Sequence, residues 1–370
     1  MKKNFAKKTA LACLTGLVVS LFASCQDVVL NNIRREVELE DGNVSGDIRS
    51  VVRFKQYYYL ANGGILFKQN DSNYYGAWIH SACPGGHVIK LAADKNYLYA
   101  LVGISQENEK EGTNVGVSRA LYYSEDGSNW NLVTGVGTDG VIPIVSKSMV
   151  YTYLFCTNAI NEENRIAYFI TNGGATVPTE NKAFQLDGAL ATELELATED
   201  AQTKPCSGTI LVSKSCVWYN GKTYFFLSNA CATNETTSAS ATMYYYGSAN
   251  LLRWGGENEN TTGISFSDTI SSLAITANYI LVGTYSGIKH NVLDDGVPGA
   301  SAAFANNADA TLSSAYRILS LLVVNPELEE EKTAIYASQV YTGNGSSNSA
   351  QFDHVGLWAY YPARGNWNRE

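Results

Sequence analysis

The sequence predicts an all-β protein, a six-bladed β-propeller of four-stranded antiparallel blades. A unit of strands and turns recurs along the chain at intervals of roughly 40 to 65 residues. Charged residues make up only 16% of the sequence, and its 24 tyrosines suit short strands rather than long helices. Six such units favour a closed radial array, which leaves only short strand edges exposed. The alternatives are seven blades or two β-sandwiches, although the chain has no Pro- or Ser-rich linker near its middle.

Each unit begins with an apolar strand, followed by a short polar turn and a second strand that is often rich in tyrosine. We expect the first strands at Ile48–Phe54, His87–Ala93, Ile144–Tyr151, Gly208–Ser213, Ile270–Thr276 and Arg317–Val324. We expect second strands at Tyr57–Ala61, Tyr97–Gly103, Lys222–Ser228, Tyr279–Thr284 and Ala334–Gln339. The propeller domain is therefore expected over residues 48–370.

Residues 1–24 have the order of a secretory signal peptide. A cationic start contains Lys2, Lys3, Lys7 and Lys8, and the uncharged stretch 10–22 that follows is too short to span a bilayer. We expect this segment to be cleaved on export. The cleavage removes four lysines and no acidic residue, so the net charge falls from −9 to −13. Such an acidic body argues against nucleic acid as a partner, and we expect a monomer.

The end of this segment, Leu21-Phe22-Ala23-Ser24-Cys25, resembles the lipobox of bacterial lipoproteins. The resemblance implies that Cys25 becomes the lipid-modified first residue, carrying palmitate or similar acyl chains, although Phe22 departs from the usual residue type. Several acyl chains hold a protein stably on a membrane. The expected location is the bacterial cell envelope, at the outer rather than the inner membrane. Residues 25–47 would form a tether, within which residues 36–40 could instead close the last blade.

One hairpin carries a recognisable motif, Ser124-Glu125-Asp126-Gly127-Ser128-Asn129-Trp130. It resembles the Asp-box hairpin of sialidase-type propellers, in which Asp accepts backbone N–H bonds, Gly takes a positive φ and Trp packs across the hairpin base. A degraded second copy keeps Ser248, Asn250 and Trp254. The motif is a folding device in the families that it resembles, so it implies architecture and no chemistry.

The resemblance raises a glycosidase as the alternative function. A sialidase-like site needs several arginines, a Tyr nucleophile with a partner Glu, and an Asp acid/base. Arg53 and Arg317 lie on expected first strands, whereas Arg119 and Arg165 are expected to begin third strands. This set does not assemble into the required site, so we predict no catalytic residues and a protein that is not an enzyme.

His80, Cys83 and His87 are the residues with metal-ligand character, since imidazole and thiolate bind zinc or copper. Three ligands from one loop that contains Pro84-Gly85-Gly86 are not a familiar spacing. A turn between strand ends is the favoured interpretation, and we expect neither metal nor cofactor. The exported body also carries cysteines whose pairing the sequence leaves open. These are Cys83, Cys156, Cys206, Cys216 and Cys231, among which a Cys206–Cys231 bridge is one possibility.

The long insertions are expected on one face of the propeller. Connections from strand 2 to 3 and from strand 4 to the next strand 1 emerge at the same end of the strands of a blade. These insertions, which define the long-loop face, are Ser105–Ser118, Asn229–Thr242, Gly343–Gln351, Ala191–Cys206 and Asp294–Ala315. Recognition residues concentrate on loops held by a rigid scaffold. We therefore expect a lipid-anchored, non-enzymatic propeller that binds a protein or glycan through this face.

Overall fold

The structure is a computed structural model of the chain, and it describes a little more than half of the residues. The described residues are 44, 46–69, 77–106, 116–137, 141–143, 151–172, 182–194, 215–219, 222–228, 241–246, 251–253, 265–266, 270–284, 287–294, 297–298, 302–304, 316–324, 333–341, 355–362 and 365–370. Residues 1–42, with the expected signal peptide, Cys25 and most of the tether, lie outside them. None of the described residues forms a helix with the length and apolar character of a membrane span.

The described strands form five sheets. The first contains β1 (Ser50–Phe54), β2 (Tyr57–Ala61), β3 (Ile65–Gln69) and β4 (Ile79–His80). The second contains β5 (His87–Ala93), β6 (Leu98–Gln106), β7 (Gly116–Ser124) and β8 (Asn131–Leu132), with β9 (Val141–Pro143) also paired to β7. The fourth contains β19 (Ile270–Ile275), β20 (Tyr279–Thr284), β21 (Gly287–Asp294) and β22 (Val297–Pro298), with β23 (Ala302–Ala303) also paired to β21. The fifth contains β24 (Tyr316–Val324), β25 (Ala334–Tyr341), β26 (Gly356–Tyr361) and β27 (Asn366–Arg369).

The third sheet has nine strands and holds two successive antiparallel meanders. The first meander is β10 (Tyr151–Asn158), β11 (Ala167–Asn172), β12 (Lys182–Asp187) and β13 (Leu190–Glu193), with the 3-10 turn η1 (Glu162–Asn164) between β10 and β11. The second is β14 (Cys216–Tyr219), β15 (Lys222–Ser228), β16 (Ala241–Tyr246) and β17 (Leu251–Arg253), with β18 (Ser265–Phe266) also paired to β16. The two meanders join where β10 and β14 pair in parallel.

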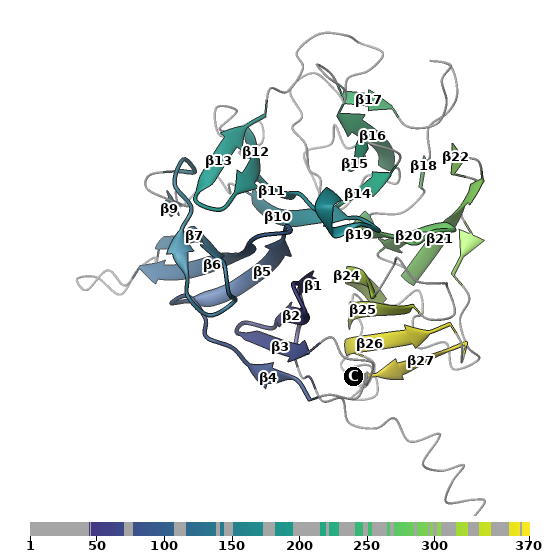
Figure 1. Cartoon of the computed structure of the whole chain (residues 1–370), viewed down its shortest axis with the longest axis horizontal. Helices are drawn as coiled ribbons and strands as arrows, with labels where there is room; N and C mark the ends of the chain where they lie inside the picture. Colours follow the sequence, from purple (N-terminus) through teal and green to yellow (C-terminus); the bar gives the residue numbers. More distant parts are fainter. Residues whose placement is uncertain are drawn as a thin grey trace, which may run out of the picture. The chain divides into compact units, whose positions relative to one another are not determined.

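The sheets are arranged as a propeller (Figure 1). The first strand of each meander lies nearest the centre, and successive first strands are in contact around it: β1 with β5, β5 with β10, β10 with β14, β14 with β19, β19 with β24, and β24 with β1. The all-β fold and the four-stranded antiparallel units are thus as predicted, and the two-sandwich alternative is wrong.

The predicted number of six separate blades is wrong, because the described strands form five sheets. The reason is the end of β10, where Thr157 pairs with Cys216 and Asn158 with Val217. A long connection through η1 lets β10 run two residues beyond Cys156, which is the last residue paired with β11. The extended end then reaches β14, and one hydrogen-bonded sheet replaces two.

Strand positions agree with the prediction where a tight turn marks the hairpin. β2, β5 and β15 have the predicted bounds. The third unit was misplaced, because β10 begins at Tyr151, where the predicted strand ends, and Val141–Pro143 pairs with β7 instead. In the fourth unit the first strand is β14, whereas the predicted strand at residues 208–213 lies outside the described residues.

The hydrophobic core lies between neighbouring sheets rather than at the centre. Leu60 and Tyr58 of β2 pack with Tyr336 and Leu357 of the fifth sheet. Further clusters of the same kind lie between the first and second sheets, between the second and third, and between the fourth and fifth. The first, second and fifth sheets are therefore covered on both faces by their neighbours, which explains why their strands are apolar on both sides.

A buried ion pair joins the last residue to the first sheet. Lys68 Nζ lies 2.9 Å from Glu370 Oε2, and both side chains are almost fully buried. Tyr361 Oη donates to Glu370 Oε1 at 3.1 Å, and the Lys68 ammonium lies over the Trp78 and Tyr336 rings. The fifth sheet is formed by four strands from residues 316–369. Residues 36–40, which were considered as a closing strand for the last blade, lie outside the described part of the chain.

Candidate functional site at the centre of the propeller

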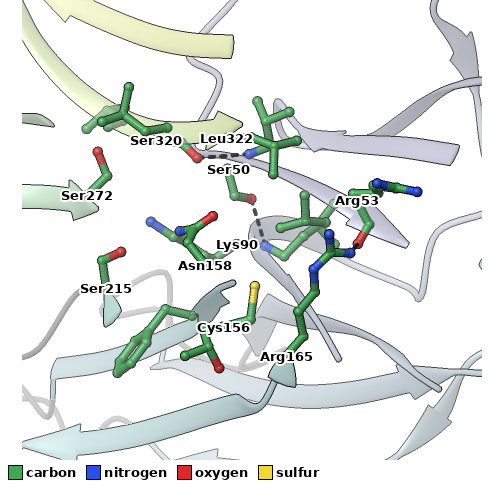
Figure 2. Close-up of a pocket in the computed structure, with 17 residues that line it drawn as sticks. Ser50, Arg53, Lys90, Cys156, Asn158, Arg165, Ser215, Ser272, Ser320 and Leu322 are labelled. Carbon is green, nitrogen blue, oxygen red and sulfur yellow. Dashed lines mark hydrogen bonds between the residues drawn. The ribbon is translucent and has the colours of Figure 1, made fainter. Parts of the chain in front are cut away.

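Serine side chains of the innermost strands hold neighbouring strands together across the centre. Each inner strand has one edge that faces the centre, so its N–H groups there need partners from another element. The Val51 N–H of β1 donates to Ser320 Oγ of β24 at 3.0 Å. The Leu91 N–H of β5 donates to Ser50 Oγ of β1 at 2.8 Å. One hydroxyl therefore satisfies a buried amide of the next strand in each case (Figure 2).

The same arrangement recurs between β14 and β19. The Leu273 N–H donates to Ser215 Oγ at 2.9 Å, and the Asn158 side-chain amide donates to the Leu273 carbonyl. Ser272 stands at the corresponding position of β19, but its Oγ has no hydrogen-bond partner among the described residues, although the side chain is only 5% exposed. Three of these serine bonds are thus made, and the fourth serine is left with a buried hydroxyl.

These serines border a small polar cavity. Its lining also contains Thr157, Asn158 and Cys156 of β10, together with apolar residues of β1, β5 and β24. The cavity volume is about 40 Å³, which is room for a few water molecules. No Asp or Glu is among the described residues that line it. Paired carboxylates of the kind that acid/base hydrolysis of a glycoside requires are thus not found among these described lining residues.

Three cationic residues, Arg53, Lys90 and Arg165, are among those that line the same cavity. Arg53 Nη2 lies 2.8 Å from Glu162 Oε1, and Arg165 Nη1 lies 3.8 Å from the same oxygen. Arg165 Nη1 also donates to the Arg53 carbonyl at 3.4 Å. Figure 2 shows the two guanidinium groups close together at one side of the cavity. The Glu162 carboxylate is thus in contact with both arginines.

The Cys156 thiol faces this cavity, as Figure 2 shows. Burial raises the pKa of Cys156, and the charges of Arg165 and Lys90 only partly oppose that effect. Burial likewise raises the pKa of Cys216 well above its ordinary value. Both thiols therefore stay protonated at neutral pH and behave as small apolar groups. Cys83, Cys156 and Cys216 are unbridged, and Cys206 and Cys231 lie outside the described residues.

Sequence reasoning missed most of this site. It placed Arg53 on the first inner strand, and β1 contains it. Arg165, however, follows η1 and lies two residues before β11, which is a second strand, and not at the start of a third strand as predicted. The shift brings Arg165 beside Arg53, whereas Arg119 donates to Thr152 in β10 and Arg317 lies in β24. A signal for the serines was present, since each precedes an apolar pair in an inner strand.

The turn between β7 and β8 contains Ser124, Asp126, Gly127 and Trp130. Asp126 Oδ1 accepts from the backbone N–H groups of Ser128 and Asn129, each at 2.8 Å. Ser124 Oγ accepts from the Gly127 N–H at 2.9 Å, and Gly127 has a φ of +80°. The hydrogen bonds from Asn129 and Ser128 hold the pKa of Asp126 well below its usual range. Ser248, Asn250 and Trp254, the second copy of the motif, lie outside the described residues.

This turn is also a contact between the first and second sheets. Ser81 Oγ donates to the Gly127 carbonyl at 3.0 Å, and the Trp130 indole N–H donates to the Ala82 carbonyl at 3.0 Å. A Cβ added at Gly127 would lie 2.3 Å from Tyr59 Oη, so no other residue fits there. Burial raises the pKa of Tyr59 to about 12, with smaller effects from the charges of Tyr57 and Asp126.

His80 ends β4, His87 begins β5, and Cys83 lies in the exposed loop between them. Across the described part of the chain, no three His, Cys, Asp or Glu side chains are grouped so as to hold a metal ion. The His87 ring packs against Gly63, and Cys83 Sγ donates to the Ser81 carbonyl at 3.5 Å. The three candidates are therefore not brought together.

The strands that flank the predicted long loops have the expected order. The β6–β7, β15–β16 and β25–β26 connections join second to third strands, and the β13–β14 connection joins a fourth strand to the next first strand. In antiparallel meanders these connections emerge at the same end of the strands, and so on the same face of the propeller. The predicted bounds of one loop were too wide, because β22 and β23 lie within Asp294–Ala315 and belong to the fourth sheet. Most residues of all five loops lie outside the described part of the chain.

Comparisons with known proteins bear on the fold. No protein-family model matches the chain, and no curated protein sequence is similar to it. The tricorn protease is similar in structure, with a TM-score of 0.50 and 10% identity over 88% of this chain and 26% of that one. A glucose dehydrogenase has a TM-score of 0.47 and 9% identity over 83% and 99% of the two chains. The extracellular domain of a one-component system from B. thetaiotaomicron has a TM-score of 0.41 and 13% identity over 84% and 32%. At such identities the likeness concerns the propeller-like fold alone.

The serine bonds predict a specific loss of stability. Ser320→Ala leaves the Val51 N–H buried without its acceptor, so we expect the free energy of unfolding to fall by about 1–3 kcal/mol. Ser272→Ala is the matched control, because it removes a hydroxyl without a described partner and should cost less than about 0.5 kcal/mol. Urea unfolding of both variants measures the difference, and equal losses would contradict the account.

The β7–β8 turn predicts an acid-dependent effect. Because hydrogen bonds depress the pKa of Asp126 in the folded state, its carboxylate stabilises the protein at neutral pH and loses that effect as the pH falls below about 4. Asp126→Ala should lower the free energy of unfolding by about 1 kcal/mol at pH 7, and the difference from wild type should shrink toward pH 3. Chemical denaturation at several pH values measures it, with the exposed neighbour Glu125→Ala as control. A difference that is constant with pH would contradict the assignment.

Proposed function

We propose that this protein is a lipid-anchored β-propeller of a bacterial cell envelope, that it is not an enzyme, and that it binds a protein or glycan partner through the long-loop face. The observation that carries the proposal is the small size of the cavity that the inner strands line. A cavity of about 40 Å³ does not admit a monosaccharide, and the described lining residues include no carboxylate. A hydrolase of the sialidase type would need both the space and the acids at this place.

The arrangement of the connections supports a binding role at the periphery. Four of the five predicted long loops have described strands before and after them. The order of these strands places the four connections on one face of the propeller. The opposite face of the propeller carries tight turns, such as Asp94–Tyr97 between β5 and β6. In this turn Asp94 Oδ1 accepts from the Asn96 and Tyr97 N–H groups. A rigid scaffold with its longer loops at one edge is typical of a recognition module.

Lipid anchoring rests on the sequence Leu21-Phe22-Ala23-Ser24-Cys25 and on the signal peptide that precedes it. Acylation at Cys25 would hold the body at a membrane surface without a spanning helix. An acidic body, with a net charge of −13 after residue 24, would gain no attraction from anionic lipid headgroups. The acyl chains would therefore have to supply the membrane affinity.

Substitution of Cys25 tests the anchor. Cys25→Ser should abolish incorporation of radiolabelled palmitate and move the protein from the detergent-rich to the aqueous phase in a Triton X-114 partition. Cys13→Ser, within the apolar part of the signal peptide, is the control and should leave both readouts unchanged. Retention of the label in the Cys25→Ser variant would refute the proposal.

The binding face is tested by replacing one long loop. A chain in which Gly343–Gln351 is exchanged for a short Gly-Ser turn should lose about tenfold or more of its partner capture in a cross-linking pull-down from intact envelopes. Replacement of Glu329 and Glu330, which lie in the sequence between β24 and β25, by Gln is the control and should leave capture unchanged. Undiminished capture after loop replacement, or cleavage of fluorogenic sialosides by the purified body, would contradict the proposed function.

A further inference from the structure

The chain enters the propeller beside Glu370. The Val44 N–H donates to the Glu370 carbonyl at 3.3 Å, and the Glu370 N–H donates to the Leu357 carbonyl, near the start of β26, at 2.9 Å. Val44 is only 1% exposed and packs with Ile48 in the hydrophobic cluster between the first and fifth sheets. Apolar burial and a backbone hydrogen bond thus fix the point at which the body is joined to the residues before Val44.

This entry point lies on the long-loop face. β1 is the first strand of its meander, and β27, which Glu370 follows, is the fourth strand of another. In antiparallel meanders, first strands begin and fourth strands end on one face, where the connections from second to third strands also emerge. Two short connections on this face are fully described, residues 62–64 between β2 and β3 and residues 81–86 between β4 and β5. The turn between β5 and β6 lies on the opposite face.

The distance along the chain from Cys25 to Val44 limits how a body anchored at Cys25 can be turned. The two residues are 19 positions apart, which spans at most about 65 Å when fully extended. A flexible Gly-rich chain of this length spans about 25 Å. The blades are about 30 Å thick, since β24 has nine residues. To bring the opposite face to the membrane, residues 26–43 would have to pass the rim and this whole thickness nearly extended, which costs conformational entropy.

We propose that the long-loop face is turned toward the membrane that carries the Cys25 lipid, and that it binds a protein embedded in this membrane. This orientation rests on the proposed lipid anchor, and it specifies the class of partner for the proposed binding face. A partner confined to the same membrane meets the face at a raised effective concentration. The net charge of −13 on the exported body opposes binding to anionic headgroups or anionic glycans of the membrane surface, and so favours a protein.

Fluorescence energy transfer tests the orientation. Cys83 is an exposed, unbridged thiol in the connection 81–86, and Lys95 is an exposed residue in the turn between β5 and β6. The lipidated protein, with Cys206 and Cys231 replaced by Ser, is placed on phosphatidylcholine vesicles that contain a rhodamine-labelled lipid as acceptor. Transfer from a donor dye at Cys83 should exceed that from a dye at Lys95→Cys in a Cys83→Ser chain about twofold or more, because the two faces are about 30 Å apart. Mass spectrometry confirms that each chain carries one dye, at the intended position.

The outcomes separate the orientation from the anchor. Equal transfer from the two positions, or greater transfer from Lys95→Cys, would overturn the orientation and would leave the lipid anchor intact, because the protein is still on the vesicles. A protein that does not bind the vesicles at all would refute the anchor, and the orientation with it. The partition of the Cys25→Ser variant in Triton X-114 measures the anchor independently.

Photo-cross-linking in intact cells tests the class of partner. Gly85 accepts p-benzoylphenylalanine without a clash, since an added Cβ meets no atom within 4 Å. Lys95 is the control position on the opposite face. Irradiation should give a cross-linked product from position 85 that is lost when the cross-linker is moved to position 95, and mass spectrometry should identify the partner as a protein with membrane-spanning segments. A product with lipid, glycan or a protein without such segments, or equal products from both positions, would overturn the proposal, as would the absence of any product from position 85.

Discussion

The backbone N–H groups on the inner edges of the central strands have to be satisfied without an adjacent strand, and the rest of the structure depends on how this is done. In a flat sheet an unpaired edge is open to water or to another chain. At the centre of a propeller it is buried, so each free N–H would cost about 1–3 kcal/mol. Serine hydroxyls from the neighbouring strand accept the Val51, Leu91 and Leu273 amides. Between β10 and β14 the backbones pair directly instead. Both solutions bring the inner strands close and fix the order of the sheets.

Close inner strands leave little space at the centre, and this has a functional consequence. The cavity that the described inner strands line has a volume of about 40 Å³, which is room for a few water molecules. The apolar core lies between the sheets, where it makes the scaffold rigid. This is why we propose that a protein or glycan partner is bound by the long loops rather than at the centre.

The sequence was sufficient to predict the all-β class, the four-stranded units and several strand bounds. Tight turns with clear signals flank β2, β5 and β15, and these strands were placed correctly. β10 was misplaced because its hairpin is replaced by a longer connection through η1, which carries no short turn signal. The number of sheets was predicted wrongly for the same reason. Thr157 and Asn158, which extend β10 beyond its pairing with β11, pair with β14 and join two units in one sheet. Pairing of this kind depends on tertiary position and leaves no local pattern.

The central cluster could be predicted only in part. Arg53 and Arg165 are 112 residues apart, and they meet because the third unit packs beside the first two. Without the correct place for β10, the sequence put Arg165 on the wrong strand. The β7–β8 turn was different, because its bonds run between residues two or three positions apart and local sequence encodes them. Contacts within a turn were thus visible in the sequence, and contacts between sheets were not.

The serine bonds at the centre are tested most directly by hydrogen exchange of individual amides, measured by NMR on the unmodified protein. The amide hydrogens of Val51, Leu91 and Leu273 have no strand partner of their own, yet they donate to serine oxygens. The account predicts that all three exchange only through global unfolding, as slowly as amides in the middle of β2 or β6. Exchange at the rate of open strand edges would contradict it, because the inner edges would then be solvated and the centre open.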